Sequence, residues 1–104
     1  MRKQNLMLFP PELAAEFVAE QEGFKAEAYK CPTGHWTIGF GHAQNVHKGD
    51  VITRSEAYEL LDRDLQRTQE ELATLINIDI NENQFIALMS FVYNFGLTKC
   101  PTYR

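Results

Sequence analysis

Three side chains capable of chemistry follow one another at fixed spacing in the first half of the chain. Glu22 is separated from Cys31 by eight residues, and Cys31 is separated from Thr37 by five. A carboxylic acid can donate a proton, whereas a thiol or a hydroxyl can hold or activate a water molecule. If the fold gathers these groups, one proton donor and two water-handling groups surround a single point.

A helix is expected to carry Glu22. Pro11 suits the first turn of a helix, and residues at helical spacing follow it at Leu13, Ala14, Phe17, Val18 and Gln21. Gly23 should end this helix, which leaves Glu22 at its C-terminal edge.

A β-hairpin is expected to carry Cys31 and Thr37. The run Pro32–Gly34 is a turn signal. After this turn, large side chains alternate with smaller ones, as in a short strand, at Trp36, Ile38 and Phe40.

Two further helices are predicted in the second half. Thr53 and Glu56 have the spacing of a capping box, and the helix that they open should run to about Leu75. Its apolar side consists of Ala57, Leu60, Leu61, Leu65, Leu72, Leu75 and Ile76. The run Asn81–Gln84 repeats the capping pattern before a second apolar stripe at Phe85, Leu88, Met89, Val92 and Tyr93. We expect the end of this stripe, from Met89 to Tyr93, to face water unless a partner covers it.

These elements predict an α+β fold with an N-terminal helix, a small antiparallel sheet and then helices. A length of 104 residues suits one domain, and a composition of 44% hydrophobic and 23% charged residues is ordinary for a soluble globular protein. No apolar run approaches the length of a membrane span. The net charge of −4 argues against a nucleic-acid partner, because such proteins usually carry a basic face.

The segment from Glu22 to His42 resembles the catalytic signature of the phage-type lysozymes, the endolysins of glycoside hydrolase family 24. In that family, the position of Cys31 is held by Asp or Cys. The flanking runs Glu22–Phe24 and Trp36–His42 match the family almost position for position. The similarity continues through the second half and covers the chain from about residue 11 to about residue 97.

The resemblance implies a lysozyme-like fold in a single domain, residues 1–104, with three parts. Residues 11–52 would form the catalytic lobe with the small sheet, residues 53–78 the interlobe helix, and residues 79–104 the start of a helical lobe. In the family, several more helices complete that second lobe, whereas here the sequence stops at Arg104. We therefore expect an incomplete helical C-terminal lobe, which self-association would complete.

The resemblance also implies a muramidase, which hydrolyses the β-1,4 bond between N-acetylmuramic acid and N-acetylglucosamine in bacterial peptidoglycan and so causes host cell lysis. Glu22 would protonate the leaving oxygen, and Cys31 and Thr37 would govern the opposite face of the sugar. Asn94 corresponds to an amide that faces the cleft and would contact the substrate. No cofactor and no metal is expected. The competing expectation is a truncated, non-catalytic remnant or a peptidoglycan-binding module.

The chemical role of Cys31 stays open among nucleophile, base and water-positioning group. Its alternative is a small, half-buried apolar residue. Cys31 and Cys100 are expected to be reduced thiols, because the N-terminal sequence contains no export signal. For the same reason we expect the protein to stay in the cytoplasm of the host bacterium until lysis releases it to the wall.

His42 is expected to be structural. In the family the corresponding histidine pairs with an aspartate of the interlobe helix, so the resemblance implies a His42–Asp64 ion pair. A zinc site built from Cys31, His35, His42 and His47 is a weak alternative, because the spacing fits no compact ligand pattern. A Cys–His hydrolase using Cys31 with His35 or His42 is equally weak, because no third orienting group is evident.

Overall fold

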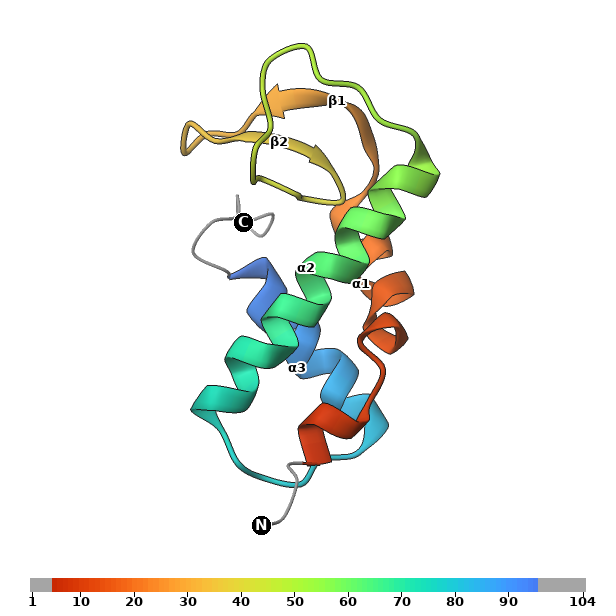
Figure 1. The fold of residues 1–104 in the computed structure, drawn as a ribbon, viewed down its shortest axis with the longest axis vertical. Coiled ribbons are helices and arrows are strands. Elements are labelled where there is room, and N and C mark those ends of the chain that lie inside the picture. The colour runs from red at the N-terminus through yellow and green to blue at the C-terminus, as the bar shows by residue number, and fades with distance from the viewer. Residues whose placement is uncertain (1–4, 96–104) are drawn as a thin grey trace.

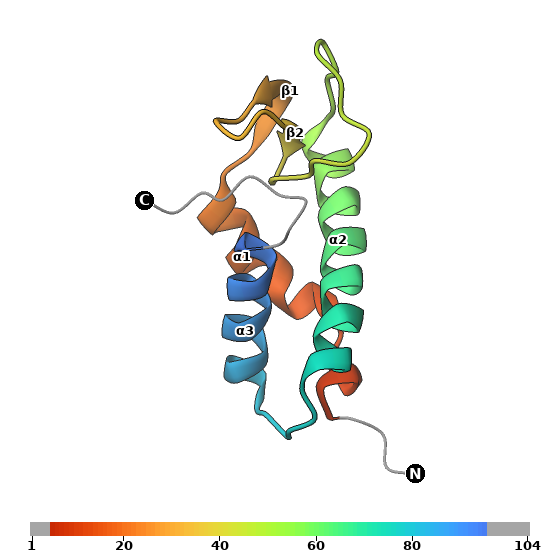
Figure 2. The same cartoon turned by 90° about the vertical axis from the view of Figure 1, so that its left-hand side faces the viewer.

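The computed structural model describes residues 5–95 (Figure 1). The elements within them are, in chain order, η1 Asn5–Leu8, η2 Pro11–Ala14, α1 Ala15–Glu22, β1 Lys25–Lys30, β2 Trp36–Gly39, α2 Arg54–Leu75 and α3 Glu82–Asn94. The sheet lies at one end of the molecule, and α2 runs from that end to the other, where α3 packs against it (Figure 1, Figure 2). The predicted α+β class is therefore confirmed. None of the described helices has both the length and the apolar composition needed to cross a bilayer.

The helix predicted to start at Pro11 is divided in two. Its first turn is the 3₁₀ helix η2, and the α-helix α1 follows directly. Gly23 ends α1 as predicted, with a φ of 75° that favours glycine, and its N–H donates to the carbonyl of Ala19 at 2.9 Å. Glu22 is therefore the last residue of α1.

The predicted hairpin is present, with β1 and β2 paired antiparallel. Tyr29 lies opposite Thr37, and Lys30 lies opposite Trp36. The register shifts between Lys25 and Tyr29, so the two strands do not pair evenly along their length.

A tight turn ends β2 at Gly39, one position before the predicted strand residue Phe40. Ile38 and His42 exchange two backbone hydrogen bonds of 2.9 Å across this turn. Gly39 has a φ of 67°, and a Cβ atom at this position would lie 3.2 Å from the Cβ of Ala57. Glycine therefore allows both the turn and its close approach to α2.

Both predicted helix caps are present. Thr53 Oγ1 accepts the N–H of Glu56 at 3.1 Å, and Glu56 Oε1 accepts the N–H of Thr53 at 2.8 Å. Asn81 and Gln84 form the same reciprocal pair at the start of α3. These local patterns fix where the two long helices begin.

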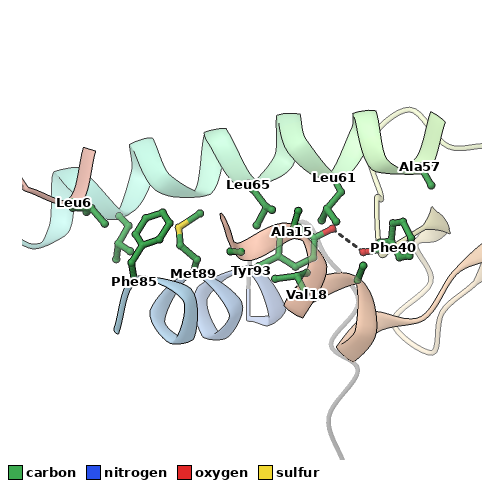
Figure 3. Close-up of a cluster of buried hydrophobic side chains, with 13 residues drawn as sticks. Leu6, Ala15, Val18, Phe40, Ala57, Leu61, Leu65, Phe85, Met89 and Tyr93 are labelled. Carbon is green, nitrogen blue, oxygen red and sulfur yellow. Dashed lines mark hydrogen bonds between the residues drawn. The ribbon is translucent and has the colours of Figure 1, made fainter. Parts of the chain in front are cut away.

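The prediction that the end of the α3 stripe faces water is wrong for Met89 and Tyr93. Phe85 and Met89 are 0% exposed and Tyr93 is 4% exposed. Figure 3 shows these side chains in one row against α2, with Leu6 at the far end. Phe9 also covers the stripe, and its ring stacks on Phe85 with centroids 4.9 Å apart. The covering surface is thus made by α2 and the N-terminal segment of the same chain.

Gln69 attaches this N-terminal segment to α2. Its Nε2 atom donates to the carbonyl oxygens of Leu6 at 2.9 Å and Phe9 at 2.8 Å. Gln69 is buried, and both hydrogens of its amide nitrogen have acceptors. Thr68 and Gln69 therefore belong to the interior, whereas Gln66, Arg67, Glu70 and Glu71 of the same polar stretch are exposed.

Candidate active site

Glu22 stands at the junction between helix and sheet. It is half-buried at the end of α1, and Gly23 turns the chain away toward β1. Cys31 directly follows the other end of β1. The strand curves between these two points (Figure 1), so the proton donor and the thiol flank it from opposite ends.

Cys31 and Thr37 are held by one carbonyl group. The oxygen of His35 accepts the backbone N–H of Cys31 at 2.9 Å and the hydroxyl of Thr37 at 3.2 Å. Cys31 is 3% exposed and Thr37 is 0% exposed. The hairpin therefore buries both residues and gives the Cys31 backbone and the Thr37 side chain one common acceptor.

A second set of contacts links Cys31 to a histidine. The Cys31 Sγ atom lies 2.9 Å from Thr33 Oγ1, and Thr33 Oγ1 lies 3.0 Å from His35 Nδ1. The sequence disfavoured a Cys–His hydrolase because no third orienting group was evident. Thr33 links the thiol to the imidazole ring, but it lies between them and is not a third group that orients the histidine. This link could have been noticed in the sequence, because residues 31, 33 and 35 are two positions apart across a predicted turn.

His42 and Asp64 form the contact expected from the resemblance. His42 Nδ1 lies 2.8 Å from Asp64 Oδ2, and both side chains are largely buried. Arg67 Nη1 lies 3.3 Å from the other carboxylate oxygen of Asp64. His42 follows the turn of residues 39–41, called the glycine turn below, and Asp64 is on α2. This contact therefore fastens the end of the glycine turn to the long helix.

Tyr93 connects α3 to the same turn. Its hydroxyl donates to the carbonyl oxygen of Phe40 at 2.8 Å (Figure 3). Burial raises the pKa of Tyr93 well above its usual value, and Asp64, Glu22 and Tyr29 raise it further. The sequence indicated Tyr93 only as an apolar position. A buried tyrosine usually finds a hydrogen-bond partner for its hydroxyl, so a tyrosine in a buried stripe could have indicated this contact.

A cavity of about 580 Å³ lies between α2, α3 and the segment 41–44. His42, Asp64 and Tyr93 contribute to its wall. Leu75 also lines it and is 77% exposed, so this residue departs from the predicted apolar packing of α2. Glu22, Cys31 and Thr37 do not line this cavity, and Asn94, the last residue of α3, is half-buried outside its lining.

The residues of the weak zinc alternative do not form a metal cluster. Within residues 5–95, no group of three or more His, Cys, Asp or Glu side chains could hold a metal ion. Cys100, the second predicted thiol, lies outside this range.

Comparison with known proteins points to one family. The phage lysozyme family profile matches residues 19–102. An endolysin of Acyrthosiphon pisum secondary endosymbiont phage 1 is 38% identical over 85 residues, which cover 82% of this chain and 58% of that protein. An endolysin of Bacillus phage B103 is 42% identical over 79 residues, which cover 73% of this chain and 30% of that protein.

Solved structures are similar as well. The muramidase domain of SpmX from Asticaccaulis excentricus has a TM-score of 0.74 and 35% identity, covering 80% of this chain and 56% of that one. An endolysin from Escherichia coli O157:H7 phage FAHEc1 has a TM-score of 0.77 and 28% identity, covering 92% of this chain and 63% of that one. The chain spans less than two thirds of the length of each of these relatives.

Proposed function

This chain belongs to the phage lysozyme family, and from that premise we propose that it is a muramidase acting on bacterial peptidoglycan. The bond cleaved is the β-1,4 link between N-acetylmuramic acid and N-acetylglucosamine. The observation that carries this proposal is the hairpin beside α1, where Glu22 and Cys31 flank β1 and Thr37 shares a carbonyl with Cys31. Glycoside hydrolysis needs an acid and a second group on opposite sides of the scissile bond.

Glu22 acts as the general acid. It donates its proton to the glycosidic oxygen as the bond between that oxygen and the anomeric carbon breaks. Its half-buried position at the end of α1, where Gly23 turns the chain toward β1, suits this role.

Cys31 and Thr37 act on the water that attacks the opposite face. The Thr37 hydroxyl donates to the His35 carbonyl, so its oxygen offers lone pairs to a water hydrogen. The sulfur of Cys31, in its thiolate form, takes the proton that the water loses and becomes a neutral thiol. Attack from the face opposite the leaving group inverts the configuration of the anomeric carbon.

The remaining site residues hold the catalytic hairpin in place and contact the sugar. The His42–Asp64 contact and the Tyr93–Phe40 hydrogen bond hold the glycine turn against α2 and α3. Asn94, beside Tyr93 at the end of α3, contacts the substrate through its amide.

The test is clearing of chloroform-permeabilised Gram-negative cells in reducing buffer. The wild-type chain and Glu20→Gln should both clear the suspension, because Glu20 is an exposed residue on the same helix. Glu22→Gln should not clear it. If the folded wild-type chain fails to clear the cells, the proposal is overturned, and sedimentation with purified peptidoglycan would then test for a binding module.

Architecture and partners form part of the same proposal. Residues 11–52 serve as the catalytic lobe, 53–78 as the interlobe segment and 79–104 as the start of a helical lobe. Phe91 and Phe95 are 61% and 43% exposed beside the cavity, and a second copy covers them. Light scattering should show a dimer that Phe91→Ser weakens, and a strictly monomeric lytic protein would contradict this.

The named endolysin relatives support a cell-wall target. We place the protein in the cytoplasm of the host bacterium until lysis gives it access to the wall. Fractionation of expressing cells before lysis checks this location, and a periplasmic pool at that stage would contradict it.

A further inference from the structure

The buried thiol of Cys31 is connected to the protein surface by two hydrogen bonds. Cys31 Sγ contacts Thr33 Oγ1 at 2.9 Å, and Thr33 Oγ1 contacts His35 Nδ1 at 3.0 Å. Cys31 is 3% exposed, whereas Thr33 and His35 are exposed. The three residues therefore form a path from the interior of the hairpin to solvent.

We propose that Thr33 and His35 are positioning residues that withdraw the proton from the Cys31 thiol and exchange it with solvent. The inference rests on the proposed function, because it explains how a thiol does the work of a base there. A neutral thiol is a poor base and nucleophile, and the thiolate is the reactive form.

The proton balance is simple. The Cys31 S–H donates to Thr33 Oγ1, and the Thr33 O–H donates to His35 Nδ1. When the sulfur proton moves to Oγ1, the original hydroxyl proton moves to Nδ1. The products are a thiolate, an unchanged threonine hydroxyl that donates to it, and an imidazolium. In turnover, the thiolate takes one proton from the attacking water, and the path then passes one proton to solvent through His35.

The hairpin geometry supports this assignment. The His35 carbonyl accepts the N–H of Cys31 at 2.9 Å and the hydroxyl of Thr37 at 3.2 Å. The same residue thus fixes the backbone of Cys31 and the side chain of Thr37, while its ring contacts Thr33. A shift of His35 would disturb the thiol and the hydroxyl together.

Other ionisable groups lie on the elements next to the hairpin turn. They are Lys25, Glu27, Tyr29 and Lys30 on β1, His47, Lys48 and Asp50 on the loop beside β1, and Glu22 at the end of α1. His35 differs from all of them because one hydroxyl links it to the sulfur. His47 is exposed and contacts Asp50, so it serves as a matched control histidine.

The experiment measures the thiolate directly in the full chain carrying Cys100→Ser. Thiolate absorbance and the rate of alkylation by iodoacetamide are followed from mildly acidic to mildly alkaline pH, with Cys31→Ser as the blank. Thr33→Val and His35→Gln should lower the thiolate fraction at neutral pH by about tenfold, equivalent to one pKa unit. Thr33→Ser keeps the hydroxyl and should restore the fraction, and His47→Gln should leave it unchanged.

Cell clearing by the same variants is measured in parallel. We expect kcat to fall with the thiolate fraction while KM stays constant, because the path touches no sugar. An unchanged thiolate fraction in folded Thr33→Val and His35→Gln overturns the inference, even if clearing still depends on Glu22. The opposite result is also informative. If the variants change the thiolate fraction as expected but the wild-type chain clears no cells, the path is supported and the proposed function is overturned. If His35→Gln does not fold, the comparison of Thr33→Val with Thr33→Ser decides alone.

Discussion

The two ends of the molecule are held together by different kinds of interaction. At the sheet end, hydrogen bonds and one ion-pair contact fix the hairpin and the glycine turn, through His35, His42 and Tyr93. At the helical end, the row that includes Phe85 and Met89 packs against α2 and the N-terminal segment. Directional contacts hold the candidate catalytic groups, whereas the helical end relies mainly on non-directional apolar burial, to which Gln69 adds two hydrogen bonds.

The largest effect is expected from Phe85→Ala at the helical end. Phe85 is 0% exposed, so its truncation leaves a cavity and should lower the free energy of unfolding by about 3–5 kcal/mol. Urea unfolding followed by circular dichroism measures this loss. Phe17→Ala, the same truncation at a 45% exposed position on α1, should lower it by much less. Similar losses for the two variants would contradict the packing described for α3.

Tyr93→Phe tests the contact between the two ends. The variant keeps the ring in the core but leaves the buried Phe40 carbonyl without its donor, which should cost about 1–3 kcal/mol. The same urea titration, together with kcat for cell-wall hydrolysis, shows whether the turn also loses its catalytic geometry. Tyr58→Phe, at a half-buried tyrosine near the turn, is the control. Unfolding curves for Tyr93→Phe that match the parent would mean that the hydrogen bond contributes nothing.

Alkaline pH tests the same contact without a mutation. The folded-state pKa of Tyr93 is raised, so its contribution to stability is complete below the ordinary tyrosine pKa of about 10. That contribution is lost as pH rises from there through the raised value, by up to about 1.4 kcal/mol per pH unit. Urea midpoints measured across this range should fall less steeply for Tyr93→Phe than for the parent. Parallel curves would show that Tyr93 ionises equally well in both states.

The smallest effect is expected from Thr53→Ala where α2 begins. This change removes the side-chain oxygen that accepts the Glu56 N–H and should cost about 1 kcal/mol. Thermal unfolding measures it, with Ser55→Ala as an exposed control one residue before Glu56. If Thr53→Ala lowered the free energy of unfolding as much as Phe85→Ala does, the helix cap at the sheet end would stabilise the protein as much as apolar burial at the helical end.

Local sequence patterns predicted the elements whose determinants lie close together in the chain. The end of α1 at Gly23, the hairpin turn and both capping boxes are of this kind, because each depends on residues within a few positions. The family resemblance supplied the pairing of His42 with Asp64, which no local spacing specifies.

The parts that could not be predicted depend on contacts across long sequence separations. Nothing near Phe85 indicates that Leu6 and Phe9 cover it, and nothing near Gln69 indicates their carbonyls as its acceptors. At the candidate site, the link through Thr33 depends on side-chain conformations around the turn, which residue types alone do not determine.

The amide of Gln69 has a consequence for protein synthesis. Leu6 and Phe9 are translated before their partner, because the side chain that binds their carbonyl oxygens is made only when translation reaches residue 69. Their apolar partner Phe85 is made later still. This segment is therefore translated well before the residues that hold it in place, and nascent chains that end before residue 69 expose it to chaperones and proteases.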